Sequence, residues 1–350
     1  MNEMYKKILK KINDNNLKIS IVGLGYVGLQ LLIGFSKSKN TIYGIDIDIH
    51  KIKKLKKNKS YINYIKDDKI EKLRNKDISF HSDYSPIEKS DVIILCLPTP
   101  LKKNKPDLSF LKHACIEIKT KINPGSVLIL ESTSYPGTTE EFLYDTLNLQ
   151  RFTLGKNFFL GFSPEREDPG NKKYSLEKIP KVISGYSKNC IQIIDKIYKI
   201  VVKKTVIANS IKVAETSKLL ENIYRAVNVT LVNEIKLITN KLNIDIFDVI
   251  NVAKTKPFGF KAFYPGPGLG GHCLPIDPLY LSYKAKQLGV RANFIELINK
   301  INSKIPGNII NIINRKIGSK KKNILILGVT YKPNIDDIRE SSGIKLLKLI

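Results

Sequence analysis

The sequence predicts an α/β protein whose N-terminal part is a doubly wound parallel sheet, followed by a central helical part with one long helix. Two observations lead to this fold class. Apolar, β-branched segments alternate with helical segments over about the first 200 residues, which is typical of parallel βαβ units. Residues 210–241 then show a helical period without any glycine or proline, which indicates a single long helix.

The first strand is expected at residues 18–23, where KISIVG combines apolar and β-branched side chains. A glycine-rich turn leads from it into an apolar helix, YVGLQLLIGF, and a second strand follows at TIYGIDID. Further strands are expected at DVIILCLP, SVLILEST and FFLGFS, which are residues 91–98, 126–133 and 158–163. This order of strands and helices predicts a Rossmann-type sheet over residues 1–205.

The central helical part is expected to span residues 206–317. A helix over residues 210–241 would be on the order of 45 Å long, which is more than one small domain needs, so we expect it to connect two lobes. Its apolar positions recur at helical spacing and predict a homodimer interface. Packing within the chain's own core is the alternative for these positions, which are Leu219, Ile223, Val227, Leu231 and Ile235.

Residues 318–350 are expected to begin another α/β domain, with KKNILILGVTYKP as a strand and SSGIKLLKLI as a helix. One strand and one helix cannot bury both faces of a parallel sheet. The sequence therefore predicts only the beginning of a C-terminal domain, truncated in this chain.

The chain of 350 residues has a formal net charge of +27, which would ordinarily suggest a nucleic-acid partner. Its lysines are spread throughout and accompany many Ile and Asn residues, so compositional drift is favoured, with attraction of an anionic small molecule as an alternative. No apolar run reaches the roughly 18 residues of a membrane span, and the N-terminus lacks the apolar core of a signal peptide. The four cysteines show no metal-ligand spacing. We expect a cytoplasmic protein with reduced thiols and no metal, nucleic-acid or membrane partner.

The motif GLGYVG at residues 23–28 follows the first strand and opens a helix, and Asp46 ends the next strand about 20 residues later. Glycines at these positions let the backbone approach a pyrophosphate at a helix N-terminus, while the carboxylate binds the ribose hydroxyls. An acid at this place repels a 2′-phosphate. The motif therefore predicts NAD rather than NADP as the cofactor, with an ordinary glycine turn as the alternative.

Cys273 lies in the glycine- and proline-rich segment PGPGLGGHCLPIDPLYL. A thiol in such a loop, beside a nicotinamide-binding domain, is suited to act as a nucleophile toward a carbonyl. A dehydrogenase that oxidises an aldehyde to an acid needs this nucleophile, because a thiohemiacetal offers a second C–H from which a hydride leaves. A structural cysteine in a loop is the alternative.

The chain resembles the UDP-glucose/GDP-mannose dehydrogenase family in six ordered segments. These are IVGLGYVGL, ESTSYPGTTEE, SPEREDPGN, KLLENIYRAVNVTLVNE, PGPGLGGHCLPIDP and ILGVTYKPNIDDIRESS. The segments SPEREDPGN and FYPGPGLGGHC are more similar to the UDP-N-acetylglucosamine 6-dehydrogenase branch than to the UDP-glucose branch, which usually has Ser before the cysteine. The resemblance covers the chain from about residue 18 to its last residue.

The resemblance implies an NAD-dependent, two-step, four-electron oxidation of a sugar C6 hydroxymethyl group to a carboxylate. It implies Cys273 as the nucleophile, Lys218 and Asn222 as stabilisers of negative charge on the C6 oxygen, and Asp277 as a partner in proton transfer. Glu165 is the implied general base that activates water for thioester hydrolysis, and Thr133 the residue that helps to hold that water. Structural roles are the alternatives: Lys218 as a solvated lysine, Asp277 as a turn-stabilising residue and Thr133 as a helix cap.

The predicted cofactor-binding and substrate-binding sets follow from the glycine motif and the resemblance together. The cofactor set is Gly23, Gly25, Tyr26, Val27, Gly28, Asp46, Lys51, Thr99, Thr133 and Arg339. The substrate set, for a UDP-sugar, is Glu165, Arg166, Lys218, Asn222, Tyr264, Gly270 and Lys332. His272, which stands where the UDP-glucose branch has Ser, is expected to serve specificity or packing.

Several alternatives stay open at this point. The substrate could be UDP-glucose or UDP-N-acetylmannosamine, and the shortened chain could be an inactive relative. A hydroxyacid or 6-phosphogluconate-type dehydrogenase would share the glycine motif and the long helix but would give Cys273 no role. A binding protein without catalysis would make use of the +27 charge.

Overall fold

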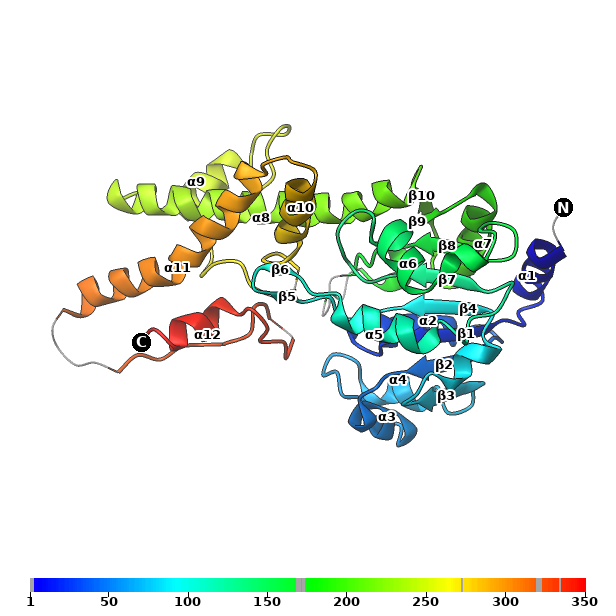
Figure 1. The fold of residues 1–350 in the computed structure, drawn as a ribbon. Coiled ribbons are helices and arrows are strands. Elements are labelled where there is room, and N and C mark those ends of the chain that lie inside the picture. The colour runs from blue at the N-terminus through cyan, green and yellow to red at the C-terminus, as the bar shows by residue number, and fades with distance from the viewer. Residues whose placement is uncertain (1–2, 168–170, 172–173, 272, 319–322, 334) are drawn as a thin grey trace. The chain divides into compact units, whose positions relative to one another are not determined.

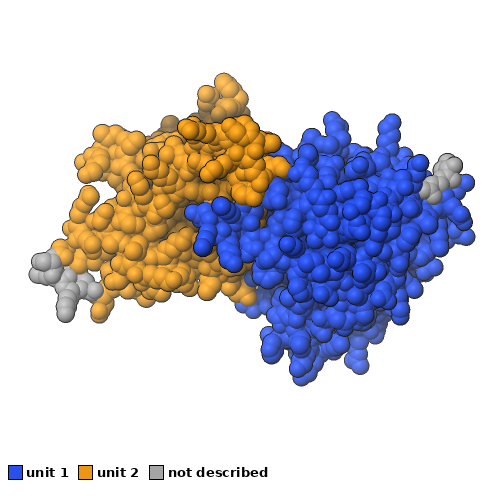
Figure 2. Space-filling model, viewed as in Figure 1, with its two compact units in different colours: residues 1–218 blue, residues 219–350 orange. Residues whose placement is uncertain are grey.

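The computed structural model of the chain describes residues 3–167, 171, 174–271, 273–318, 323–333 and 335–350. It divides into two compact units, residues 1–218 and residues 219–350 (Figures 1 and 2). The boundary falls inside a helix, thirteen residues beyond the domain boundary expected at 205. The three-domain division expected from the sequence stays a prediction.

The first unit is built on an eight-stranded sheet in the order β10-β9-β8-β7-β4-β1-β2-β3 (Figure 1). All neighbouring strands are parallel except β8 and β9, which are antiparallel. The strands are β1 (Lys18–Val22), β2 (Thr41–Ile45), β3 (Ile78–His81), β4 (Val92–Leu95), β7 (Val127–Leu130), β8 (Phe159–Phe162), β9 (Lys181–Gly185) and β10 (Thr205–Ile207). The predicted doubly wound parallel sheet is confirmed.

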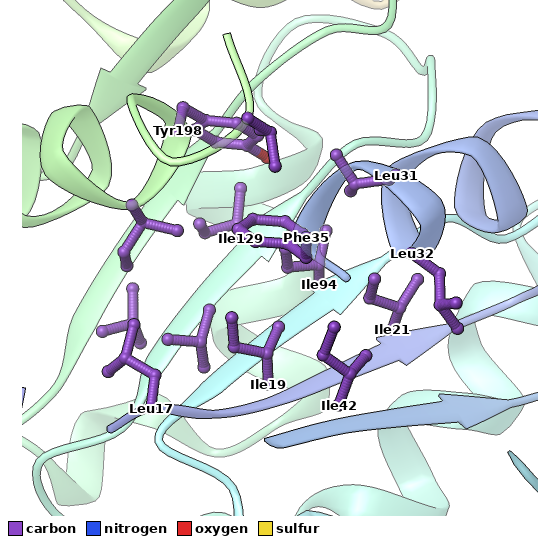
Figure 3. Close-up of a cluster of buried hydrophobic side chains, with 14 of the residues drawn as sticks. Leu17, Ile19, Ile21, Leu31, Leu32, Phe35, Ile42, Ile94, Ile129 and Tyr198 are labelled. Carbon is purple, nitrogen blue, oxygen red and sulfur yellow. The ribbon is translucent and has the colours of Figure 1, made fainter. Parts of the chain in front are cut away.

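The strands β4 and β7 are apolar at every position because helices cover both faces of the sheet. In β4, Val92 and Ile94 enter one hydrophobic core while Ile93 and Leu95 enter the other, as the two-residue period of a strand requires. Figure 3 shows the first core, where Phe35 and Tyr198 pack over strand residues such as Ile94. The larger polar side chains near β4 and β7 therefore lie beyond the ends of these strands.

The helices of the first unit divide between the two faces. Side chains of α1 (Glu3–Asn13), α2 (Tyr26–Phe35), α3 (Ile49–Lys56) and α7 (Lys188–Tyr198) enter the first core. Those of α5 (Ser109–Ile118) and the start of α8 (Ile211–Lys241) enter the second. The short helices α4 (Asp67–Glu71) and α6 (Tyr144–Thr146) also belong to this unit. The expected helix YVGLQLLIGF coincides with α2, and α8 confirms the expected long helix.

Three sheet strands and a hairpin had no signal that we recognised in the sequence. The edge strand β3 is half-buried throughout, so it lacks an apolar run, and β10 has only three residues. β9 begins with a lysine. The hairpin of β5 (Leu101–Lys102) and β6 (Lys105–Pro106) has two-residue strands. Short or polar strands of this kind form because neighbouring strands supply their hydrogen bonds.

The second unit is helical in its described residues. It contains α9 (Ile246–Ala253), α10 (Asp277–Gln287), α11 (Asn293–Ile317) and α12 (Ser342–Leu347), together with most of α8. The expected helix near residue 342 is α12. No helix in the described part of the chain is both long and apolar enough to cross a membrane.

The strand expected at KKNILILGVTYKP is not formed, and this expectation was wrong. None of its described residues belongs to a strand, and the side chains of Leu325 and Leu327 are 82% and 87% exposed. A strand needs a hydrogen-bonded neighbour, and none pairs with the described residues of this segment.

Glu215 on α8 holds the turn that begins at Gly137. Its buried carboxylate accepts hydrogen bonds from the backbone N–H groups of Gly137 (2.6 Å) and Thr139 (3.0 Å) and from the hydroxyl of Thr139 (2.8 Å). Glu215 therefore caps this helical turn, a role for which the sequence had suggested Thr133. Burial raises the pKa of Glu215 to about 7, although these hydrogen bonds oppose the shift.

Glu215→Gln should change how stability depends on pH. Since the pKa of Glu215 is raised by folding, the folded state binds more protons than the unfolded state between about pH 4 and 7, and stability falls as pH rises through that window. Glutamine cannot ionise. Between pH 5 and pH 8 the free energy of unfolding of the variant should therefore fall by about 2–3 kcal/mol less than that of the unmodified protein. Urea unfolding at both pH values measures this difference, and equal losses in the two proteins would contradict it.

Candidate functional site

The glycine turn after β1 has the shape that a bound pyrophosphate requires. Gly23 has φ +91°, and a Cβ added there would lie 2.5 Å from the carbonyl oxygen of Cys96. A Cβ at Gly28 would lie 1.9 Å from the carbonyl oxygen of Gly23, whereas one at Gly25 would meet nothing within 4 Å. The first and third glycines thus permit close packing, and the second leaves open space at the N-terminus of α2. No side chain caps this helix end.

Asp46 lies directly after β2 and is 8% exposed. Its carboxylate accepts hydrogen bonds from the N–H groups of Leu24 and Asp48, both at 2.9 Å, and lies 3.0 Å from the ammonium of Lys51. These contacts hold the carboxylate against the glycine turn. The expected pairing of a glycine turn with a fixed acid is therefore present, and these residues fit a dinucleotide.

The remaining predicted cofactor residues of the first unit follow neighbouring strands. The hydroxyl of Thr99, after β4, donates a 2.6 Å hydrogen bond to the carbonyl of Thr133, after β7. Tyr26 stacks on Tyr64 at the start of α2, with ring centroids 5.8 Å apart, and Val27 is half-buried beside it. Since parallel strands end at the same edge, all of these groups lie at the carboxyl edge of the sheet.

Glu165 follows β8 at this same edge. One carboxylate oxygen accepts hydrogen bonds from the N–H groups of Arg166 (2.6 Å) and Glu167 (2.5 Å), and the other lies 3.1 Å from the ammonium of Lys181. Burial raises the pKa of Glu165, but Lys181, the N–H of Glu167 and the charge of Lys218 outweigh burial and hold this pKa below its ordinary value. Glu165 is therefore a carboxylate at neutral pH, and Lys218 acts on it electrostatically.

Lys181, Glu131 and Tyr198 form a buried polar group that the sequence did not lead us to expect. The Lys181 ammonium lies 2.6 Å from a carboxylate oxygen of Glu131, whose other oxygen accepts a hydrogen bond from the Tyr198 hydroxyl. Glu131 lies in ESTSYPGTTEE, one of the six segments that resemble the family, so the sequence did give a reason to single it out. Lys181 is one of 59 lysines and arginines, and nothing in the sequence separated it from solvated lysines.

In the second unit the structure brings Asn222 and Asp277 into contact. The side-chain amide of Asn222 donates a hydrogen bond to the carboxylate of Asp277, which begins α10 and is 2% exposed. Asn222 lies one turn after Lys218 on α8, and so on the same helix face. Lys218 is itself 9% exposed. A lysine and an aspartate this buried are not ordinary solvated side chains.

The Cys273 loop bends sharply because it packs against the C-terminal segment. A Cβ at Gly270 would lie 2.7 Å from the Cβ of Tyr331, and Gly271 has φ +83° with the Tyr331 ring 2.8–2.9 Å from its added Cβ. The carbonyl of Cys273 accepts hydrogen bonds from the N–H groups of Ile276 and Asp277. The glycines therefore serve packing inside this unit, while Cys273 is the only exposed cysteine of the four.

The other predicted residues are placed as follows. Arg166 donates a 3.0 Å hydrogen bond to the carbonyl of Pro180, and Tyr264 is 48% exposed and stacks on Phe247. Lys332 is half-buried, while Arg339 is exposed and donates hydrogen bonds to both carboxylate oxygens of Asp337. His272 lies outside the described residues. No cluster of three or more metal-ligating side chains occurs in the part of the chain that the structure describes.

Comparison with known proteins shows the family of this chain. The model of the UDP-glucose/GDP-mannose dehydrogenase family, NAD binding domain, matches residues 17–202, and the model of the family's central domain matches residues 212–304. Protein CapL of Staphylococcus aureus is 38% identical over 341 residues, and UDP-N-acetyl-D-glucosamine 6-dehydrogenase of Salmonella typhi is 36% identical over 343 residues. Each alignment covers 95% of this chain and 79% of the relative.

A solved structure is also similar over most of its length. The UDP-D-ManNAc dehydrogenase from Pyrococcus horikoshii has a TM-score of 0.87 at 32% sequence identity. The alignment covers 95% of this chain and 80% of that chain.

Asp46→Asn should weaken NAD binding by roughly 10-fold or more, because hydrogen bonds to a charged carboxylate contribute about 1.5–3 kcal/mol. It should also relax the exclusion of NADP, since Lys51 would then face a 2′-phosphate without an opposing acid. Calorimetric titration with both cofactors measures this. Asp48→Asn, which alters the neighbouring acid that caps α3, is the matched control. Equal affinity of the unmodified protein for NAD and NADP would contradict the assignment.

Proposed function

We propose that this chain, which belongs to the UDP-glucose/GDP-mannose dehydrogenase family, oxidises C6 of UDP-N-acetylglucosamine to a carboxylate with two equivalents of NAD. Its exposed cysteine carries the proposal. An enzyme that only interconverts an alcohol and a ketone needs no nucleophile, whereas oxidation of an aldehyde to an acid does. Cys273 is exposed, and it lies in a loop held by contacts within its own unit.

The first oxidation removes a proton from the C6 hydroxyl and a hydride from C6. When bound, NAD accepts the hydride in each of the two oxidations. Asp277, held by Asn222, is suited to take part in the proton transfer, and the ammonium of Lys218 is suited to stabilise negative charge on the C6 oxygen. The burial of Lys218 and Asp277 supports these roles, since buried charges act strongly.

The second oxidation depends on Cys273. Its sulfur adds to the aldehyde carbon to give a thiohemiacetal, and loss of the hydride from that carbon gives a thioester. Glu165 takes a proton from a water molecule as the water attacks the thioester, which releases the acid and the thiol. Glu165 is ionised at neutral pH and can therefore accept this proton, and we assign Thr133 to holding the water.

The identity of the sugar rests on the relatives. Two relatives named UDP-N-acetyl-D-glucosamine 6-dehydrogenase are 36% and 34% identical to this chain, and one named UDP-N-acetyl-D-mannosamine dehydrogenase is 32% identical. UDP-N-acetylmannosamine is therefore the second candidate. We assign Arg166, Tyr264, Gly270 and Lys332 to binding of the UDP-sugar, and Arg339 to the cofactor. We also place the reaction in the cytoplasm, where the Cys273 thiol stays reduced.

The reaction class is tested by counting NADH formed per sugar across a panel of UDP-sugars. Two NADH per UDP-N-acetylglucosamine are expected. Glu165→Gln should slow acid release by about 10²–10⁴-fold, because the thioester would form without an activated water to hydrolyse it. Mass spectrometry should then find the nucleotide sugar attached to Cys273.

Cys273→Ser is the matched variant for this test. It should nearly abolish acid formation, because a serine hydroxyl forms a reactive alkoxide far less readily near neutral pH. Acid formation by Cys273→Ser at the unmodified rate would show that the cysteine is structural.

A homodimer along α8 is also part of our proposal, through a stripe that shares only Leu231 with the expected one. Leu219 and Ile223 are 0% and 7% exposed and already pack within their own chain. Leu220, Tyr224 and Leu231 are 63%, 50% and 49% exposed and recur at helical spacing. An exposed apolar stripe of this kind supports an interface with a second copy.

Sedimentation equilibrium at micromolar concentration should give about twice the 39.6 kDa mass of one chain. Leu231→Asp should shift the protein toward monomer, because it places a charge in the apolar stripe. Ile116→Asp, at an exposed helix position of the first unit, is the control and should leave the mass unchanged. A monomer mass for the unmodified protein would refute the dimer.

A further inference from the structure

We propose that Lys181 is a positioning residue for the hydrolytic step, whose buried ammonium keeps Glu165 ionised and fixes the direction of its carboxylate. This inference rests on the proposed function, which gives Glu165 its role as general base. The ammonium lies 3.1 Å from Glu165 and 2.6 Å from Glu131, and its side chain is 3% exposed. It thus bridges two carboxylates away from solvent.

The direction of β9 explains how a strand's first residue reaches this edge. β8 and β9 are antiparallel, with Phe162 opposite Ser184 and Gly161 opposite Gly185. The start of β9 therefore lies beside the end of β8, where Glu165 follows. A parallel β9 would have carried Lys181 to the opposite edge of the sheet. The one antiparallel junction of this sheet delivers a cation to the edge where the parallel strands end.

A buried ammonium is costly unless it is paired. Removal of a charged group from water costs several kcal/mol, and only close partners in good geometry offset this. Glu131 and Glu165 supply these partners, and the ring of Tyr198 lies 5.4 Å from the ammonium. Burial lowers the pKa of Lys181, but the two carboxylates raise it more, so the side chain stays charged.

Several other titratable groups act on Glu165 or on its partners. The charge of Lys218 lowers the pKa of Glu165. Burial and the charge of Glu165 raise the pKa of Glu167 to about 8, so Glu167 adds no second negative charge at neutral pH. Burial raises the pKa of the Cys96 thiol, which also stays neutral. Lys181 is a cation in direct contact with the Glu165 carboxylate.

A purely structural role for Lys181 predicts a different result. It would balance Glu131 in the folded core, and its loss would lower stability without moving the pH at which the base ionises. A positioning role requires that the pKa of Glu165 rise when the ammonium is removed, because an adjacent opposite charge lowers a carboxyl pKa by about 1–3 units.

The test compares Lys181→Met with Lys181→Arg in the full chain. Hydrolysis of the Cys273 thioester is followed in single turnover from about pH 3 to 9 by quenching and mass spectrometry, and the rate is plotted against pH. The acidic limb of this profile is the fall in hydrolysis rate at low pH, where Glu165 becomes protonated. In Lys181→Met this limb should move up by about 1–3 pH units. The first burst of NADH, which does not need Glu165, should be retained. Lys181→Arg keeps the cation and should return the limb toward its original position.

Two further variants separate this role from general effects of charge. Glu131→Gln removes the other carboxylate but leaves Lys181 paired with Glu165, so the limb should not move upward. Lys199→Met removes an exposed lysine, paired with Asp195 on the same unit, and should leave the limb in place. An unchanged limb in folded Lys181→Met, judged by its NADH burst, would overturn the proposal.

A second measurement keeps the proposal testable if Lys181→Met does not fold or if no UDP-sugar is oxidised. Carbon NMR titration of the substrate-free protein, with Glu165→Gln for assignment, gives the pKa of Glu165 directly. A pKa below the ordinary value for glutamate is expected, and it should persist in Lys181→Arg. An ordinary or raised pKa would overturn the proposal. Absence of NADH with every UDP-sugar would refute the proposed function alone.

Discussion

Helices cover both faces of the sheet in the first unit, and this coverage determines where polar chemistry can occur. Every residue of β4 and β7 is buried, so these strands carry only apolar side chains. Apart from Lys181 at the start of β9, the polar groups gathered at the carboxyl edge of the sheet lie in the segments that leave the strands. Asp46, Thr99, Thr133 and Glu165 each follow a strand of the sheet, and they share one edge because the strands that precede them are parallel.

The glycines at residues 23–28 and those at Gly270 and Gly271 both permit close packing, but against different partners. At residues 23–28 two glycines bring the helix close to the sheet, and Gly25 leaves a space that a phosphate can enter. At Gly270 and Gly271 the missing side chains make room for Tyr331 of the same unit. Packing against Tyr331 thereby fixes the loop that contains Gly270 and Gly271. The exposed thiol of Cys273 follows this packed part of the backbone.

Much of the fold and part of the site could be predicted from the sequence, for identifiable reasons. The apolar runs of β1, β4 and β7 and the uninterrupted period of α8 are local signals, and the glycine motif with Asp46 has a characteristic spacing. Lys181 was missed because burial of a lysine depends on strand pairing, which the local sequence does not encode. The failed strand near residue 325 shows the converse, since a strong local pattern forms no strand without a partner.

The arrangement of two carboxylates around one ammonium suits a base that must change its charge. When Glu165 takes a proton from water in the proposed hydrolysis, its attraction to Lys181 falls. An ammonium paired with Glu165 alone would then be left buried without a partner, which costs about 3–5 kcal/mol. Because Glu131 also contacts Lys181, and Tyr198 donates a hydrogen bond to Glu131, the ammonium keeps a partner throughout. Glu131 therefore lowers the cost of protonating Glu165, and the site can cycle between its charge states without exposing Lys181 to solvent.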